Sequence, residues 1–108
     1  MKPIRVYRNR DVESIYAFIP PGHKHIRLVI ETSDQVIVLQ EAAVAGIVRA
    51  YLNVLLHPAR RAIALKSKRI KGKPGYAEHQ LVEQTEDDEV FKEVEKLGLE
   101  GSSSQPTR

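Results

Sequence analysis

The sequence contains no cysteine, so it can form neither a disulfide framework nor a thiolate metal site. It also lacks a long uncharged hydrophobic run. The longest apolar stretch, residues 36–56, includes Glu41 and Arg49, and two charges argue against a membrane span. The first ten residues are too polar for a secretory signal. We therefore expect a cytoplasmic protein with no membrane-spanning segment.

Signatures of catalysis are missing as well. Residues 71–75, Lys-Gly-Lys-Pro-Gly, lack the GxxxxGKS/T spacing of a phosphate-binding loop. His23 and His25 would face the same way on a strand and could approach a divalent metal together with Glu31 or Asp34. Two imidazoles without an HExxH motif are nevertheless too few ligands. We expect a non-enzymatic protein without a cofactor or a metal.

Acidic residues are absent from a long segment of the chain. Residues 42–77 contain eight bases and no acid, whereas residues 78–100 contain nine acids and two bases. The formal charge of all 108 residues is only +3, so the distribution of charge is more informative than its total. Adjacent blocks of opposite charge either attract each other or serve different partners.

The remaining patterns predict one α+β domain over residues 1–100, large enough for a modest core, and a disordered polar tail at 101–108. The abundance of Ile, Val and charged residues would also suit a thermophilic source. Alternating or β-branched segments predict six strands, at residues 3–8, 12–19, 24–31, 36–39, 61–70 and 76–84. The expected order is β-β-β-β-α-β-β-α, an antiparallel sheet of about five or six strands with two helices packed on one face.

The main helix is expected at residues 41–57 and should stop before Pro58. Most of its circumference is apolar, and one small sheet can cover only one side of it. We therefore expect a homodimer in which this helix packs against a second copy. Its polar residues form one narrow stripe, which we interpret as the solvent-facing edge although it could line a cleft: Glu41, Arg49, Asn53 and His57.

One local alternative remains open at the start of the main helix. Residues 36–40 are interpreted as a strand, but Asp34 could instead cap a longer helix that includes them. The second helix is expected to begin after Thr85 with four acids in its first turn, and to end before Gly98. Its apolar face consists of Val90, Phe91, Val94 and Leu97.

Seven bases gather in the predicted hairpin formed by the last two strands: Arg60, Arg61, Lys66, Lys68, Arg69, Lys71 and Lys73. A twisted β-ribbon with basic side chains can lie along a nucleic-acid groove and neutralise phosphates. Aromatic residues near this hairpin are few, so base stacking has little support. The sequence favours a small protein that binds RNA or DNA through phosphate contacts of these seven residues, with weak sequence preference.

The same charge pattern supports other hypotheses. The protein could be a homo-oligomeric assembly or protein-interaction subunit whose basic hairpin pairs with an acidic protein surface. The acids at residues 86–89 could also dock on the hairpin of their own chain. Because exposed ion pairs contribute only about 0–1 kcal/mol each, such docking would depend on the apolar face of the second helix. Finally, the lysines could simply discourage edge-to-edge aggregation.

Overall fold

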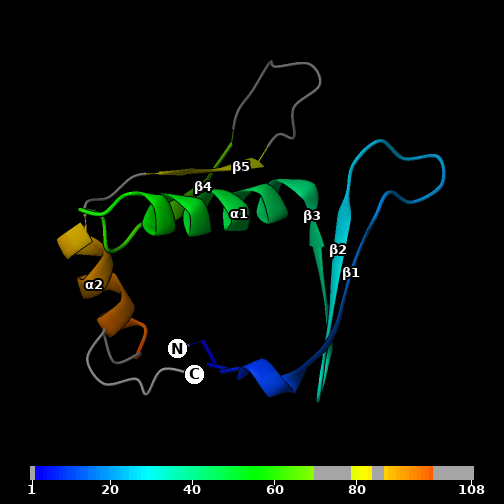
Figure 1. Cartoon of the computed structure of the whole chain (residues 1–108), viewed down its shortest axis with the longest axis horizontal. Helices are drawn as coiled ribbons and strands as arrows, with labels where there is room; N and C mark the ends of the chain where they lie inside the picture. Colours follow the sequence, from blue (N-terminus) through cyan, green and yellow to red (C-terminus); the bar gives the residue numbers. More distant parts are fainter. Residues whose placement is uncertain (1, 70–78, 84–86, 99–108) are drawn as a thin grey trace.

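The structure is a computed structural model that describes residues 2–69, 79–83 and 87–98 (Figure 1). The described residues form five strands and two α-helices in the order β-β-β-α-β-β-α. The strands make two antiparallel sheets, one of three strands and one of two. The α+β class and the antiparallel pairing are therefore confirmed, whereas the single continuous sheet is wrong.

The three-stranded sheet is a meander of β1 (Val12–Phe18), β2 (Arg27–Thr32) and β3 (Val36–Gln40), with β2 in the centre. β3 is a strand over all five residues, so the alternative of a longer helix from Asp34 is wrong. Its β-branched, uncharged sequence suits a strand that pairs along its whole length with β2.

Tight turns connect these strands where the sequence predicts them. Between β1 and β2, the His23 N–H donates to the Pro20 carbonyl at 3.0 Å, and Gly22 takes a φ of 80° that other residues rarely adopt. Between β2 and β3, the Thr32 N–H donates to the Gln35 carbonyl at 2.9 Å. Pro20, which cannot donate to a ladder, lies two residues after the end of β1.

The strand expected at residues 3–8 does not form. This segment pairs with neither sheet and is followed by a 3-10 turn at Asn9–Asp11, in which the Arg8 N–H donates to the Asp11 carboxylate at 2.9 Å. The segment is held by side chains instead: Arg5 forms an ion pair with Asp34, and the Tyr7 hydroxyl donates to the same carboxylate at 3.0 Å. The alternating segment is thus anchored by side-chain contacts and has no partner strand.

α1 (Glu41–Leu56) follows β3 directly and packs on the ribbon of β4 (Leu65–Arg69) and β5 (His79–Glu83). Gly46 is buried at this contact. The approach is so close that a Cβ at this position would lie 2.8 Å from the Cδ1 of Leu81. Arg49 also faces the ribbon and donates to the Leu81 carbonyl. Figure 1 shows α1 leaving the end of β3 and running away from β1 and β2.

α2 (Asp87–Lys96) ends as predicted, with Gly98 at a φ of 93°. Thr85, the expected N-cap, lies outside the described residues. α2 stands at the end of α1 that is distant from the three-stranded sheet (Figure 1), so the two helices do not cover one face of a common sheet. The expected helix-on-sheet layer is therefore replaced by one helix on a ribbon and a second helix at its end.

The described chain buries very few apolar side chains. Of the hydrophobic residues that the structure describes, only Ala62 and Val90 are less than one-tenth exposed, at 8% and 7%. Seventeen large hydrophobic residues of the described ranges are more than one-third exposed, whereas a domain of this length normally encloses a core. Within the part of the chain that the structure describes, no helix is both long and apolar enough to cross a bilayer.

Candidate functional site

Arg60 is paired with acids of its own chain. Its guanidinium forms ion pairs with Glu83 and, with Nε to Oδ1 at 3.7 Å, with Asp87. The same Nε donates to the Ala62 carbonyl at 3.1 Å, and the side chain is 24% exposed. Arg60 therefore stabilises the start of the ribbon against α2 and is poorly placed to contact an external phosphate.

The other predicted phosphate ligands differ in their surroundings. Lys66 forms an ion pair with Glu93 of α2 at 2.8 Å. The backbone N–H of Arg61 donates to the Asp87 carboxylate at 2.8 Å, while the Arg61 side chain is exposed. Lys68 and Arg69 are exposed at the far end of β4, and Arg69 has an interaction partner. Lys71 and Lys73 lie outside the described residues. The acidic helix thus docks on part of the basic segment within one chain.

Asp87 is the residue through which this docking can be tested. It accepts the Arg61 N–H and pairs with Arg60, and a hydrogen bond to a charged group contributes about 1.5–3 kcal/mol. We expect Asp87→Ala to lower the free energy of unfolding by at least about 1 kcal/mol. This value is below the upper end of the range because the carboxylate is one-third exposed, and water screens its interactions. Urea unfolding followed by circular dichroism measures this change. The neighbouring, exposed Asp88→Ala is the control and should change stability by less than about 0.5 kcal/mol.

The histidines do not converge on a metal site. His25 Nδ1 lies 3.1 Å from Glu41 Oε2, and the other Glu41 oxygen accepts the Ile26 N–H at 2.9 Å. These two hydrogen bonds, the backbone one first, hold the pKa of Glu41 below its ordinary value. Glu41 therefore ties the loop before β2 to the start of α1. Among the described residues no three His, Asp or Glu side chains are arranged to hold a metal.

A polar cluster at the β2–β3 turn was not predicted. Buried Thr32 donates its hydroxyl to Asp34 at 3.0 Å, and the Gln35 amide donates to the Tyr7 hydroxyl. Desolvation raises the pKa of Tyr7, but hydrogen bonds with Thr32 and Gln35 and the charge of Arg5 outweigh it and lower the pKa. Because each of these groups already has a partner, the cluster anchors the N-terminal segment and does not form an open binding site.

The polar stripe of α1 does not form a simple solvent-facing edge. Arg49 reaches the β5 backbone, and the Asn53 amide donates to the Arg49 carbonyl at 2.8 Å. A groove of about 450 Å³ near the end of the helix is lined by Asn53, His57 and Ala59 together with the paired Arg60 and Asp87. The charges that line this groove neutralise each other, so it offers no net attraction to an ionic ligand.

The side of α1 opposite Gly46 is apolar and exposed. Five exposed apolar residues lie about 100° or more around the helix from Gly46, at about 100° per residue, and we call them the outer face of α1. These residues are between 42% and 65% exposed, and they are Ile47, Val48, Tyr51, Leu52 and Leu55. Full burial of such a side chain contributes about 1.5–3 kcal/mol, so leaving the outer face in water is unfavourable.

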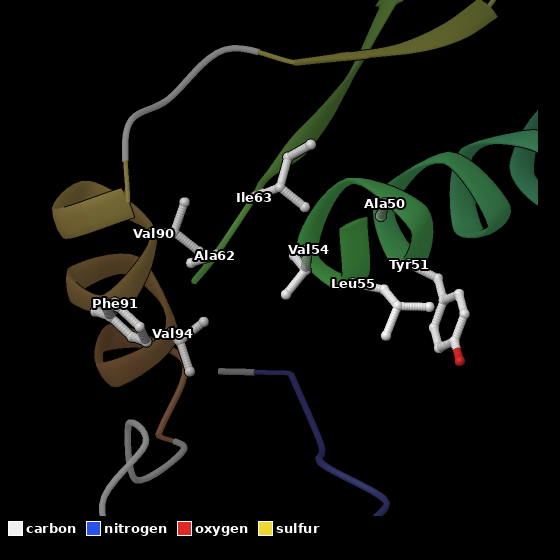
Figure 2. A pocket seen from close by; sticks show the side chains of 9 residues that line it. All are labelled: Ala50, Tyr51, Val54, Leu55, Ala62, Ile63, Val90, Phe91 and Val94. Atoms are coloured by element: carbon white, nitrogen blue, oxygen red, sulfur yellow. The ribbon is translucent and has the colours of Figure 1, made fainter. Parts of the chain in front are cut away.

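An apolar groove adjoins the outer face. It has a volume of about 510 Å³ and lies between the last turns of α1, the segment before β4 and α2 (Figure 2). Its lining is almost wholly aliphatic and aromatic: Ala50, Tyr51, Val54, Leu55, Ala62, Ile63, Val90, Phe91 and Val94. Tyr51 and Leu55 belong to both surfaces, so the groove and the outer face form one continuous apolar area.

The sequence predicted that most of the circumference of α1 is apolar and that α2 begins with acidic residues. It did not predict which side of α1 the ribbon covers. Periodicity cannot supply that side because nearly all positions of α1 are apolar. Gly46 was the available signal, since a glycine within a helix often marks a close approach of backbone or side chains. Comparison with protein-family models, with curated proteins and with solved structures finds no match for the chain.

Proposed function

We propose that the protein is a non-enzymatic assembly subunit that forms a homodimer through the outer face of α1. The observation that supports this proposal is the coincidence of an exposed apolar helix face with a described chain in which almost no large apolar side chain is buried. A chain with so little core gains its stability from association, as obligate homodimers do. A second copy is the simplest occupant because most soluble oligomers are symmetric homo-oligomers.

Charge distribution is consistent with this role. Arg60 and Lys66 already pair with acids of their own chain, which lowers the positive charge that the ribbon presents to other molecules. The outer face itself carries no charged side chain, and interface centres are typically depleted of charge. The experiment is a mass measurement by light scattering across a wide concentration range. Twice the 12.2 kDa of one chain supports the proposal, and a monomer at every concentration contradicts it.

Nucleic-acid binding is the second candidate function. It is favoured by the two-stranded ribbon of β4 and β5, on which Lys66 and Lys68 share one face. Lys68 is exposed and forms no ion pair with the described residues, and the exposed Arg61 side chain adds charge nearby. In this hypothesis Lys71 and Lys73 extend the phosphate contacts beyond the described part of the ribbon.

A single charge reversal tests the second candidate. We expect Lys68→Glu to weaken binding of random-sequence RNA or duplex DNA and to reduce the slope of log affinity against log salt by about 1 or more, because at least one phosphate contact is lost. Fluorescence anisotropy between about 50 and 200 mM salt measures both quantities. Lys24→Glu is the control, since Lys24 is also exposed but lies in the β1–β2 loop. Equal effects of the two variants would reject a site on the ribbon.

A further inference from the structure

β3 has a free edge that carries no charge. Its sequence, Val-Ile-Val-Leu-Gln, contains no proline and no bulge, and it pairs on one side with β2. Val36 and Val38 are also exposed on one face of the strand. An exposed, uncharged edge of this kind is a template for pairing with another strand.

The other strand edges in the described part of the chain are protected in the ways that proteins commonly use. β1 carries Glu13 and has an irregular register between Val12 and Ser14. The edges of the ribbon carry Lys66 and Lys68 on β4 and a glutamate at the end of β5. Charges and bulges of this kind discourage unwanted strand pairing, so their absence from β3 distinguishes this edge.

The hydrogen-bonding groups of β3 point outward in a defined pattern. The Thr32 N–H donates to the Gln35 carbonyl, so this pair is of the hydrogen-bonded type. Hydrogen-bonded and non-hydrogen-bonded pairs alternate along an antiparallel ladder. The alternation directs the N–H and C=O groups of Val36, Val38 and Gln40 away from β2. Neither Val36 nor Val38 has a hydrogen bond on its outer side to a described residue, whereas the Gln40 carbonyl belongs to the N-cap of α1 and leaves only the Gln40 N–H for pairing.

We infer that β3 pairs antiparallel with β3 of a second copy, in a register centred on Val38, so that the two three-stranded sheets form one continuous sheet of six strands. This inference rests on the proposed homodimer and adds a second part to its interface. In this register Val38 exchanges both backbone hydrogen bonds with Val38 of the second copy, and the Gln40 N–H donates to the Val36 carbonyl across the axis.

The side chains of this register are self-complementary. Val38 meets Val38 of the second copy on one face, while Ile37 meets Leu39 on the other. Ile37 and Leu39 also continue an uninterrupted apolar face of the sheet, because they lie beside Ile30 and Leu28 in the β2–β3 register. Apolar and β-branched pairs directly across an antiparallel ladder are favourable. A second copy is therefore a better match than a charged or proline-containing strand.

Continuity with α1 is a further argument for a second copy. β3 passes into α1 without a connecting loop, since β3 ends at Gln40 and α1 begins at Glu41. The free edge and the outer face of α1 thus belong to consecutive elements, and Figure 1 shows β3 and α1 at the side of the three-stranded sheet away from β1. One two-fold interface can hold both surfaces.

Two opposite charges at position 38 test the pairing. Val38 is 59% exposed in the single chain, so a charged side chain there is tolerated by the subunit itself. In the paired register, residue 38 lies directly opposite residue 38 of the second copy. We expect Val38→Lys and Val38→Glu each to raise the dissociation constant of the dimer by about tenfold or more, because each variant places two like charges opposite each other. An equimolar mixture should recover a heterodimer with an affinity near that of the wild type. Sedimentation velocity measures all three samples.

The control variant is Tyr16→Lys, at a residue with 53% exposure that lies on the same face of the sheet two strands away from Val38. It should dimerise like the wild type. Wild-type dimerisation by both position-38 variants, or dissociation that mixing does not reverse, would overturn the pairing of β3 while leaving the homodimer through α1 intact. A monomeric wild-type protein would overturn the proposed function itself. Recovery on mixing also identifies a variant that unfolds when alone, since the partner restores its fold.

Discussion

Replacing Leu55 by lysine is expected to raise the dissociation constant of the homodimer by about 10²-fold. Leu55 lies in the outer face of α1, and 59% of its side chain is exposed in the single chain. Burial of that remaining area contributes about 1–2 kcal/mol, and a two-fold axis places the substitution on both subunits, so about 2–4 kcal/mol is lost. Since 1.4 kcal/mol corresponds to a tenfold change in affinity, a wild-type constant of about 1 nM becomes about 0.1 μM, and the variant should dissociate at concentrations near and below that value.

Dissociation should also reduce the thermal stability of the Leu55→Lys variant. The described part of one chain buries few large apolar side chains, so the separated subunit retains little of the hydrophobic stabilisation that the dimer has. The midpoint of thermal unfolding of the wild type should therefore rise with protein concentration. The variant should unfold at a lower temperature that does not depend on concentration, which scanning calorimetry at two concentrations can measure.

Val6→Lys is the matched control for this prediction. Val6 is an exposed valine in the N-terminal segment, outside both the outer face and β3, and the substitution adds the same charge. It should leave the sedimentation coefficient and the unfolding temperature unchanged. If both variants dissociate alike, added positive charge and not the loss of an apolar contact is responsible. If neither dissociates, α1 does not form the interface.

The local elements of this fold could be predicted because their signals lie within a few residues of one another. Gly98 ends α2 with a positive φ, and Pro20 and Gly22 form the turn after β1. The start of α1 at Glu41 follows from the change of hydrophobic period after β3. Each of these features depends on backbone preference or on periodicity, which the sequence contains directly.

The arrangement of the elements could not be predicted because it depends on contacts between distant residues. The N-terminal segment has the alternation of a strand, but whether it enters a ladder depends on a free partner edge, and Asp34 holds it by side-chain contacts instead. The division into two sheets likewise depends on where α1 packs. A buried Gly46 against Leu81 places α1 on the ribbon, and no periodic pattern in α1 identifies that side.

The candidate site shows the same limit. The opposite charges of the two blocks made docking of α2 on the basic segment one possible outcome, and Lys66 with Glu93 is one of the pairs that forms. The sequence could not specify which bases would be paired, because the pairing of Arg60 with Glu83 and Asp87 requires the segment before β4, the end of β5 and the start of α2 to meet. The charges of the two blocks predict that they attract each other, but the tertiary structure determines which residues form ion pairs.

Gly46→Val is expected to lower the free energy of unfolding by about 1–3 kcal/mol, because it adds volume to a filled contact between α1 and the ribbon. A Cβ at this position would lie 2.8 Å from Leu81 Cδ1 and 3.3 Å from Leu81 Cβ. The first atom can move by a change of rotamer, but the second is fixed to the β5 backbone. The helix propensity that glycine lacks, about 1 kcal/mol relative to alanine, offsets part of the strain, so Gly46→Ala should change stability less than Gly46→Val.

Ala45→Val provides the control for this substitution, since the neighbouring Ala45 is exposed on the same helix and receives the same β-branched side chain. Chemical denaturation of all variants should show a loss of less than about 0.5 kcal/mol for Ala45→Val. Adding Leu81→Ala to Gly46→Val should recover stability, giving a coupling energy of at least about 0.5 kcal/mol in a double-mutant cycle. Additive effects would mean that α1 does not lie against β5 at this point, and the outer face of α1, which is defined by its position opposite Gly46, would then have to be reassigned.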